Sequence, residues 1–398
     1  MSQGHLQLLS SKSIQNQVLT TVSKVVTLYK AKSNFVICPK EIKIHGNANF
    51  GKFIDITIPR VADLLYKTYI YVKLPALDIP SGSTYCGWTN SLCHTLFKQV
   101  DLYIGEQVIA SHRSDFFEIE SEISEDANKQ TAYNSLTGKF TTYTDARTSA
   151  AGITEYYLPL KFWFCESVSQ ALPLNAIKYQ EVTFRIYLRD FQECVTYDGS
   201  TAPTAVDITD LSLIADMILL DANESRYISD SDHIFTIKQV QYTESIYVPS
   251  GTSKKNIQIP FNNNVSRLSW FFIESDSIDN NDFYNWSVRV DNSKFMDKCS
   301  IVVEGIELIT EQPEVFFRLL QGYSKSKTVS TKPLYNYIFV DSDNESFKGS
   351  TLNFSKTDSV ILRITFKSGI PACYFRCIGI NFNVFKIQKG LCGVLFTV

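Results

Sequence analysis

The chain has 398 residues, a formal net charge of −3 and a pI near 6.0, so it lacks the strongly basic field of a protein whose main work is coating nucleic acid. Its length is sufficient for two or three domains with substantial cores. Aromatic residues make up 13% of the chain, with 27 Phe and 21 Tyr, and this composition favours strands over helices.

The N-terminal residues 1–34 carry scattered apolar side chains without a clear period, and they predict an arm that becomes ordered only when neighbours bind it. The first residues lack the basic and apolar regions of a secretory signal. No stretch approaches the roughly 18 apolar residues of a spanning helix. We therefore expect the protein to be made and assembled in the cytoplasm.

Short alternating segments, typical of half-buried strands, follow one another along the chain. Examples are residues 54–58, 70–74, 182–188 and 362–366. Polar stretches between the strands are expected to be surface loops. These are residues 79–87, 141–152, 198–210, 275–285, 321–332 and 341–350. The pattern predicts all-β sandwiches rather than a parallel α/β fold.

Two short helices are predicted within loops. Asp115 is expected to cap a helix over 115–127, with Glu118 at the capping-box position. A second helix is expected to start near Pro313 and to stop at Gly322. After residue 222 the alternating pattern begins again near Val240, which predicts a connector and a second domain of similar type.

The segment LPLKFWFCESVSQALPLNAIKYQEVTFRIYL at 158–188 resembles the major capsid proteins of nucleocytoplasmic large DNA viruses. Further matching segments lie in the same order at 56–77, 88–109, 219–241 and 349–358. A collinear series from about Gly4 to about Ile364 is far more specific than a single short motif.

The resemblance implies two tandem eight-stranded antiparallel jelly rolls, with a few short helices in loops. The expected division is an N-terminal arm (1–34), jelly roll 1 (35–222), a connector (223–240) and jelly roll 2 (241–398). The family forms homotrimeric capsomers of pseudo-hexagonal outline that tile an icosahedral shell. Expected partners are further copies of the chain, neighbouring capsomers, and minor capsid and penton proteins, with no specific nucleic acid.

Family analogy places the N-terminal arm on the inner side of the shell. Lys24, Lys30 and Lys32 give it a mild positive bias that would suit a minor capsid protein or an inner membrane, although a solvated arm is the simpler interpretation. The expected location is the virion capsid, with assembly in the host cytoplasm.

Departures from the family pattern leave alternative roles open. Where the family usually has Gly-His and Gly-Gly, the chain has Cys93-His94 and Gly105-Glu106. These changes fit a divergent major capsid protein, which is the first interpretation. They also fit a minor double jelly-roll component or a temporary assembly scaffold like that of poxviruses. A sugar-binding or enzymatic jelly roll is the third alternative.

An enzyme is not expected, and the chain offers no predicted catalytic, cofactor-binding or metal-binding residue. Metal-dependent jelly-roll enzymes need a His-X-His pair with a following Glu and a further His. The histidines are far apart in sequence and never form that pair: His5, His45, His94, His112 and His233. Glu118, Glu120 and Glu122 are interpreted as the solvated face of a short helix.

Cysteine usage and glycosylation sequons carry no predicted site. The nine cysteines are odd in number and have no framework spacing, so reduced thiols are expected. Cys373 and Cys377 lack a second paired half, and packed thiols are favoured over zinc. Without entry into the secretory pathway, the five Asn-X-Ser sequons would stay unmodified; they lie at Asn223, Asn264, Asn285, Asn344 and Asn353.

Overall fold

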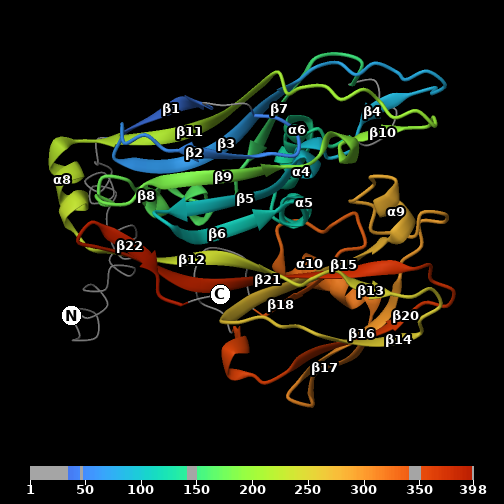
Figure 1. Cartoon of the computed structure of the whole chain (residues 1–398). Helices are drawn as coiled ribbons and strands as arrows, with labels where there is room; N and C mark the ends of the chain where they lie inside the picture. The colour runs from blue at the N-terminus through green and yellow to red at the C-terminus, as the bar shows by residue number, and fades with distance from the viewer. Residues whose placement is uncertain (1–34, 45–47, 141–149, 340–350, 397–398) are drawn as a thin grey trace.

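The computed structural model describes residues 35–44, 48–140, 150–339 and 351–396 (Figure 1). They form two β-sandwiches in succession, and the first lies above the second in Figure 1. The predicted N-terminal arm, the predicted loop 341–350 and most of the predicted loop 141–152 lie outside the described residues.

Two four-stranded antiparallel sheets make up the first sandwich. One sheet has the order β1 (Phe35–Lys43), β11 (Asp210–Leu220), β3 (Leu64–Leu74) and β7 (Thr154–Pro159). The other has the order β2 (Phe53–Thr57), β9 (Val182–Leu188), β5 (Phe97–Ile104) and β6 (Gln107–Arg113). The short strand β8 (Leu172–Pro173) extends the first sheet, and β4 (Cys86–Trp88) pairs with β10 (Val195–Tyr197).

The second sandwich repeats this plan. One sheet has the order β12 (His233–Tyr242), β21 (Cys373–Gln388), β15 (Asn264–Glu274) and β18 (Tyr335–Ile338). The other has the order β14 (Lys254–Gln258), β20 (Val360–Phe366), β16 (Met296–Val303) and β17 (Ile306–Pro313). Short strands join the first of these sheets: β13 (Ile246–Val248), β19 (Leu352–Asn353) and β22 (Leu391–Val394).

Strand order establishes the fold. When the eight main strands of each sandwich are numbered along the chain, both sandwiches have sheets of order 1-8-3-6 and 2-7-4-5. This is the jelly-roll arrangement, and it confirms two tandem eight-stranded jelly rolls. The sequence shows no convincing internal repeat, so the duplication is visible in the pairing of strands rather than in the residues.

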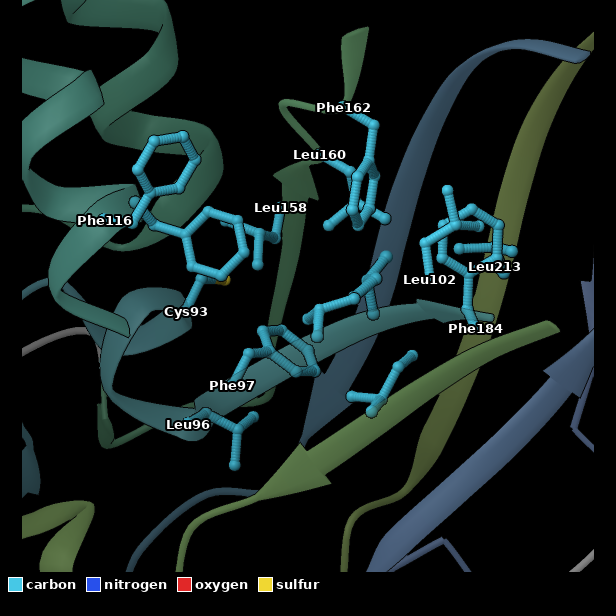
Figure 2. Close-up of a cluster of buried hydrophobic side chains, with 14 of the residues drawn as sticks. Cys93, Leu96, Phe97, Leu102, Phe116, Leu158, Leu160, Phe162, Phe184 and Leu213 are labelled. Carbon is cyan, nitrogen blue, oxygen red and sulfur yellow. The ribbon is translucent and has the colours of Figure 1, made fainter. Parts of the chain in front are cut away.

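The predicted alternation is confirmed in strand β9. Val182, Phe184, Ile186 and Leu188 are buried, whereas the residues between them are half-buried. Phe184 enters a core that also contains Phe97, Phe162 and Phe116 (Figure 2). Strands form here because each one buries a single apolar face between the two sheets of a sandwich.

The boundary between the jelly rolls differs in detail from the sequence-based division. Strand β11 ends at Leu220, helix α8 spans Ala222–Asp230, and β12 already begins at His233, within the range assigned to the connector. The buried Gln239 and Gln241 of β12 interrupt the apolar alternation, and this explains why the start of the strand was missed.

Helices lie mostly in loops, as predicted. Helix α5 covers Ser114–Ile123 and is followed by α6 (Ala127–Thr137), which was not predicted separately. The capping prediction was wrong: the N-cap is Arg113, and no side chain caps the helix. The remaining short helices are α4 (Leu92–Leu96), α9 (Ser275–Asp279), η1 (Trp163–Cys165), η2 (Val168–Gln170), η3 (Phe191–Glu193) and η5 (Phe354–Lys356).

The helix predicted after Pro313 exists as two consecutive pieces, the π-helical turn η4 (Phe316–Leu320) and α10 (Gln321–Lys325). It continues through Gly322 instead of ending there. Gly322 has helical backbone geometry rather than the positive φ of a terminating glycine, so it does not act as a C-cap.

Candidate functional site

The contact between the two jelly rolls combines buried apolar side chains with buried ion pairs. An apolar part comes first. Ile237, Phe385 and Ile387 of the second jelly roll belong to the same core cluster as Trp163 of the first. The rings of Trp163 and Phe385 lie 5.5 Å apart, centre to centre. The core of the first jelly roll therefore continues into the second.

Strand β6 makes the first polar part of this contact. The Gln239 side chain of β12 donates a hydrogen bond to the carbonyl oxygen of Ile109 at 2.6 Å. The Tyr242 hydroxyl accepts from the backbone N–H of Arg113 at 2.8 Å, and the Arg113 guanidinium lies 4.6 Å from the centre of the Tyr242 ring. These contacts position β6 against β12 through backbone atoms as well as side chains.

Helix α5 makes the second polar part, through carboxylates that reach the other jelly roll. Asp115 forms an ion pair with Arg376 of β21 at 2.9 Å. Glu120 pairs with Arg267 of β15. Asp115 was predicted to cap helix α5, but its carboxylate instead pairs with the guanidinium of Arg376.

Glu118 lies at the centre of the buried ionic cluster. Its side chain is fully buried and accepts a hydrogen bond from His94 Nδ1 at 2.6 Å. The ammonium groups of Lys139, at 2.9 Å, and of Lys332 pair with its other oxygen. Burial alone raises the pKa of Glu118, but Lys139, Lys332 and His94 outweigh burial and hold it well below the usual range.

Glu122 extends the cluster toward the segment after α10. It pairs with Lys139, and it accepts hydrogen bonds from the hydroxyl of Ser330 at 3.0 Å and from the backbone N–H of Thr331 at 3.2 Å. The Thr328 hydroxyl donates to the Glu122 carbonyl oxygen at 2.9 Å. The segment 321–332 was predicted to be a surface loop, but here it packs against the first jelly roll.

The interpretation of Glu118, Glu120 and Glu122 as a solvated helical face was wrong. All three carboxylates are largely buried and each has a basic partner. Sequence spacing did not reveal these partners because Lys332 and Arg267 lie in the other jelly roll. The three closely spaced glutamates were a sequence signal for a functional cluster. Only the tertiary structure shows that basic side chains neutralise their charges.

Two buried histidines both contact Phe117, His94 in a stacked and His112 in an edge-on arrangement. His94 Nδ1 lies 2.6 Å from the Glu118 carboxylate, to which it donates, and a neutral ring then accepts at Nε2 from the Tyr133 hydroxyl, 3.1 Å away. Burial lowers the pKa of His94, although the bond to Glu118 acts in the opposite direction. Burial also lowers the pKa of His112, to about 3, and its ring stacks 4.3 Å from that of Phe162.

Comparison with known protein families identifies the chain. The family model described as "Major capsid protein N-terminus" matches residues 23–229, which is more than half of the chain. The model described as "Large eukaryotic DNA virus major capsid protein" matches residues 224–393. The chain belongs to the major capsid protein family of large eukaryotic DNA viruses. It is thus a structural protein of the viral capsid, and we refer to it below as the capsid protein.

Relatives and solved structures agree with this assignment. The capsid protein is 26% identical to the major capsid protein of Pyramimonas orientalis virus, over 95% of this chain and 94% of the relative. It is 29% identical to that of Phaeocystis pouchetii virus, where the match covers 63% of this chain and 54% of the relative. The solved PBCV-1 capsid matches with a TM-score of 0.80 at 23% identity, over 92% of this chain and 98% of that one.

More distant structures share the fold. The Faustovirus major capsid protein matches the capsid protein with a TM-score of 0.73 at 11% identity, over 90% of this chain and 92% of that one. At such low identity the likeness concerns the fold alone. In the described parts of the capsid protein, no helix has both the length and the apolar composition needed to cross a membrane.

The other candidate residues of the capsid protein remain dispersed. His233 is half-buried and bonds to the carbonyl oxygen of Ile228 at 2.7 Å, while His5 and His45 lie outside the described residues. Cys373 and Cys377 are buried free thiols, and burial raises the pKa of Cys373 to about 12. Among the described residues, no group of three or more His, Cys, Asp or Glu side chains could hold a metal ion.

A surface hollow beside η3 also lacks a catalytic arrangement. It has a volume of about 530 Å³ and is lined by residues such as Asn49, Phe50, Asp190 and Glu193. No histidine, cysteine or lysine occurs among the residues that line it.

Proposed function

We propose that the capsid protein forms homotrimeric capsomers of pseudo-hexagonal outline that tile the icosahedral shell of a large DNA virus. The observation that carries this proposal is the repeated strand order, 1-8-3-6 and 2-7-4-5, in both jelly rolls. Three copies around a three-fold axis would then present six units of the same architecture.

The buried contact between the jelly rolls supports the proposal. A capsomer that tiles a shell needs subunits whose two halves keep a constant relative position. The shared core and the ion pairs of α5 with Arg376 and Arg267 provide this, because they can form only when both jelly rolls are in place. The protein then works by packing and performs no chemical reaction.

We further propose the division inferred from the sequence, with arm 1–34, jelly rolls 35–222 and 241–398, and connector 223–240, adjusted so that the second jelly roll begins with β12. Neighbouring capsomers and minor capsid and penton proteins are the partners in this proposal. Assembly takes place in the host cytoplasm, and the N-terminal arm contacts minor proteins or an inner membrane.

The test is the mass and outline of the isolated protein. We expect light scattering to give about three times the 45.2 kDa of one chain, and electron microscopy to show particles of hexagonal outline. A folded protein that stays monomeric at all accessible concentrations would refute the homotrimer. Abundance in purified virions separates a major capsid protein from a minor component, and a scaffold would be missing from mature particles.

A further inference from the structure

The elements by which the first jelly roll contacts the second have counterparts in the second jelly roll that contact no further jelly roll within the chain. In the first jelly roll, the fifth strand β6 and the helix α5 that follows it pack against the second jelly roll. The corresponding elements of the second jelly roll are the fifth strand β17 and the helical segment η4–α10. Figure 1 shows β17 at the lower edge of the molecule, with no sheet beyond it.

Large apolar side chains are exposed on these counterpart elements. No residue of β17 is fully buried, and Ile306 keeps 75% of its surface exposed. Tyr323 of α10 is 82% exposed. We call the exposed apolar residues of this region the donor surface: Ile306, Leu308, Val315, Leu319, Leu320 and Tyr323. Large apolar side chains exposed on adjoining elements are characteristic of interaction sites.

The sheet that would receive the donor surface is also identified by the internal contact. Strand β6 and helix α5 rest on β12, β21 and β15, which are the first, eighth and third strands of the second jelly roll. The corresponding strands of the first jelly roll are β1, β11 and β3. They lie at the upper edge in Figure 1, far from β17, so the two surfaces do not meet within one chain.

The outer face of that sheet carries tyrosines and apolar side chains beside the partly exposed ion pair of Lys73 and Glu155. Tyr69 and Tyr71 alternate with the buried Ile70 and Val72, so the two tyrosines point away from the core. Tyr71 lies 5.0 Å from Tyr157 of β7, centre to centre. With Phe35 and Ile37 of the edge strand β1, these tyrosines form what we call the acceptor surface. Tyrosine is enriched in protein–protein interfaces.

We propose that the donor surface of one copy packs on the acceptor surface of the next copy, in the way that β6 and α5 pack on the second jelly roll within a chain. This inference rests on the proposed homotrimer and names the surfaces that form it. Each copy carries one donor and one acceptor surface, so the contact is heterologous and a closed ring of three leaves neither surface free.

The test uses two lysine variants, since an exposed charge tolerates solvent but not burial in an apolar interface. The donor variant carries Ile306→Lys and Tyr323→Lys, and the acceptor variant carries Ile37→Lys and Tyr71→Lys. The matched control is Val290→Lys, because Val290 is 93% exposed and belongs to neither surface. Circular dichroism and thermal unfolding check that each variant is folded.

We expect light scattering to show a trimer for the wild type and for the control, and a monomer for each variant alone. An equimolar mixture of the two variants retains one intact donor and one intact acceptor surface. We therefore expect the mixture to form a mixed dimer that stops at two chains. Tyr323→Lys alone provides a milder donor variant if the double variant does not fold.

Different outcomes refute different statements. A trimeric wild type with variants that stay trimeric would overturn the assigned surfaces but leave the homotrimer in place, and the donor surface would then face a minor protein or a neighbouring capsomer. Acceptor variants that still trimerise, beside monomeric donor variants, would indicate a contact between two donor surfaces. A wild type that never trimerises would overturn both proposals.

Discussion

Lys332 of the second jelly roll pairs with the fully buried carboxylate of Glu118 in the first, across 214 positions of sequence. Lys139, which follows helix α6 of the first jelly roll, pairs with the same oxygen of Glu118. The charge of Glu118 thus balances cations from both halves of the chain. This ionised side chain therefore adds to the apolar core and the other ion pairs that fix the relative position of the jelly rolls.

Replacement of Glu118 by Gln should destabilise the protein strongly, because it removes the charge and leaves the ammonium groups of Lys139 and Lys332 in a buried site. We expect a loss of about 3 kcal/mol of unfolding free energy, within the range for breaking a buried ion pair. Urea denaturation followed by circular dichroism measures it. The control is Glu307→Gln, since the pair of Glu307 with Arg363 is exposed and should contribute less than about 1 kcal/mol. Equal effects of the two changes would contradict the role of Glu118.

The neutral His112 should make the protein less stable in mild acid. Burial lowers its pKa to about 3, whereas an unfolded chain titrates near 6.5, so between these values the unfolded state binds more protons. Stability is therefore fully present above pH 6.5 and falls by about 1.4 kcal/mol per pH unit as the pH drops toward 3.

The variant His112→Phe tests this prediction, because Phe keeps the stacking with Phe116 and Phe162 but does not titrate. Between pH 7 and pH 5 we expect the variant to lose about 2 kcal/mol less than the wild type in urea denaturation. His94 titrates in both proteins, so the difference isolates His112. Parallel pH profiles would show that His112 is not the titrating group.

Asp115 should act through Arg376 rather than as a helix cap. Asn can cap a helix as well as Asp can, so Asp115→Asn would be neutral for a capping residue. Because the 2.9 Å ion pair to Arg376 depends on charge, we expect this variant to lose about 1 kcal/mol. A double-mutant cycle with Arg376→Gln should show that most of this loss is shared by the pair. Additive effects would argue against the ion pair.

A methyl group at Gly379 should disrupt the core of the second jelly roll. A Cβ atom at this position would lie 2.6 Å from two ring atoms of Phe261, which is closer than packed atoms approach. We expect Gly379→Ala to lower the unfolding free energy by about 2 kcal/mol, as overpacking does. Gly152→Ala is the control, since nothing lies within 4 Å of the place that its methyl group would take, and its effect should be small. Thermal unfolding of both variants measures the two effects, and equal losses of stability would contradict the prediction.

The sequence alone correctly predicted several strands in which one face enters a core. Residues 182–188 and 362–366 alternate with the period of two because local geometry places every second side chain on the same side of a strand. Prediction was less accurate at β12, where the buried Gln239 bonds to Ile109 of the other jelly roll. A polar residue that is buried because of a distant partner looks, in sequence, like a residue of a loop.

Composition, strand periodicity and collinear motifs were therefore enough to determine the all-β class, the tandem jelly rolls and the family of this protein. The tertiary structure alone decided that Glu118, Glu120 and Glu122 are buried, that Asp115 serves an ion pair, and which sheet faces stay open. The physical reason is the range of the interactions. A strand depends on neighbours two residues away, whereas a buried charge is stable only beside cations such as Lys332 and Arg267, which the fold brings from the other jelly roll.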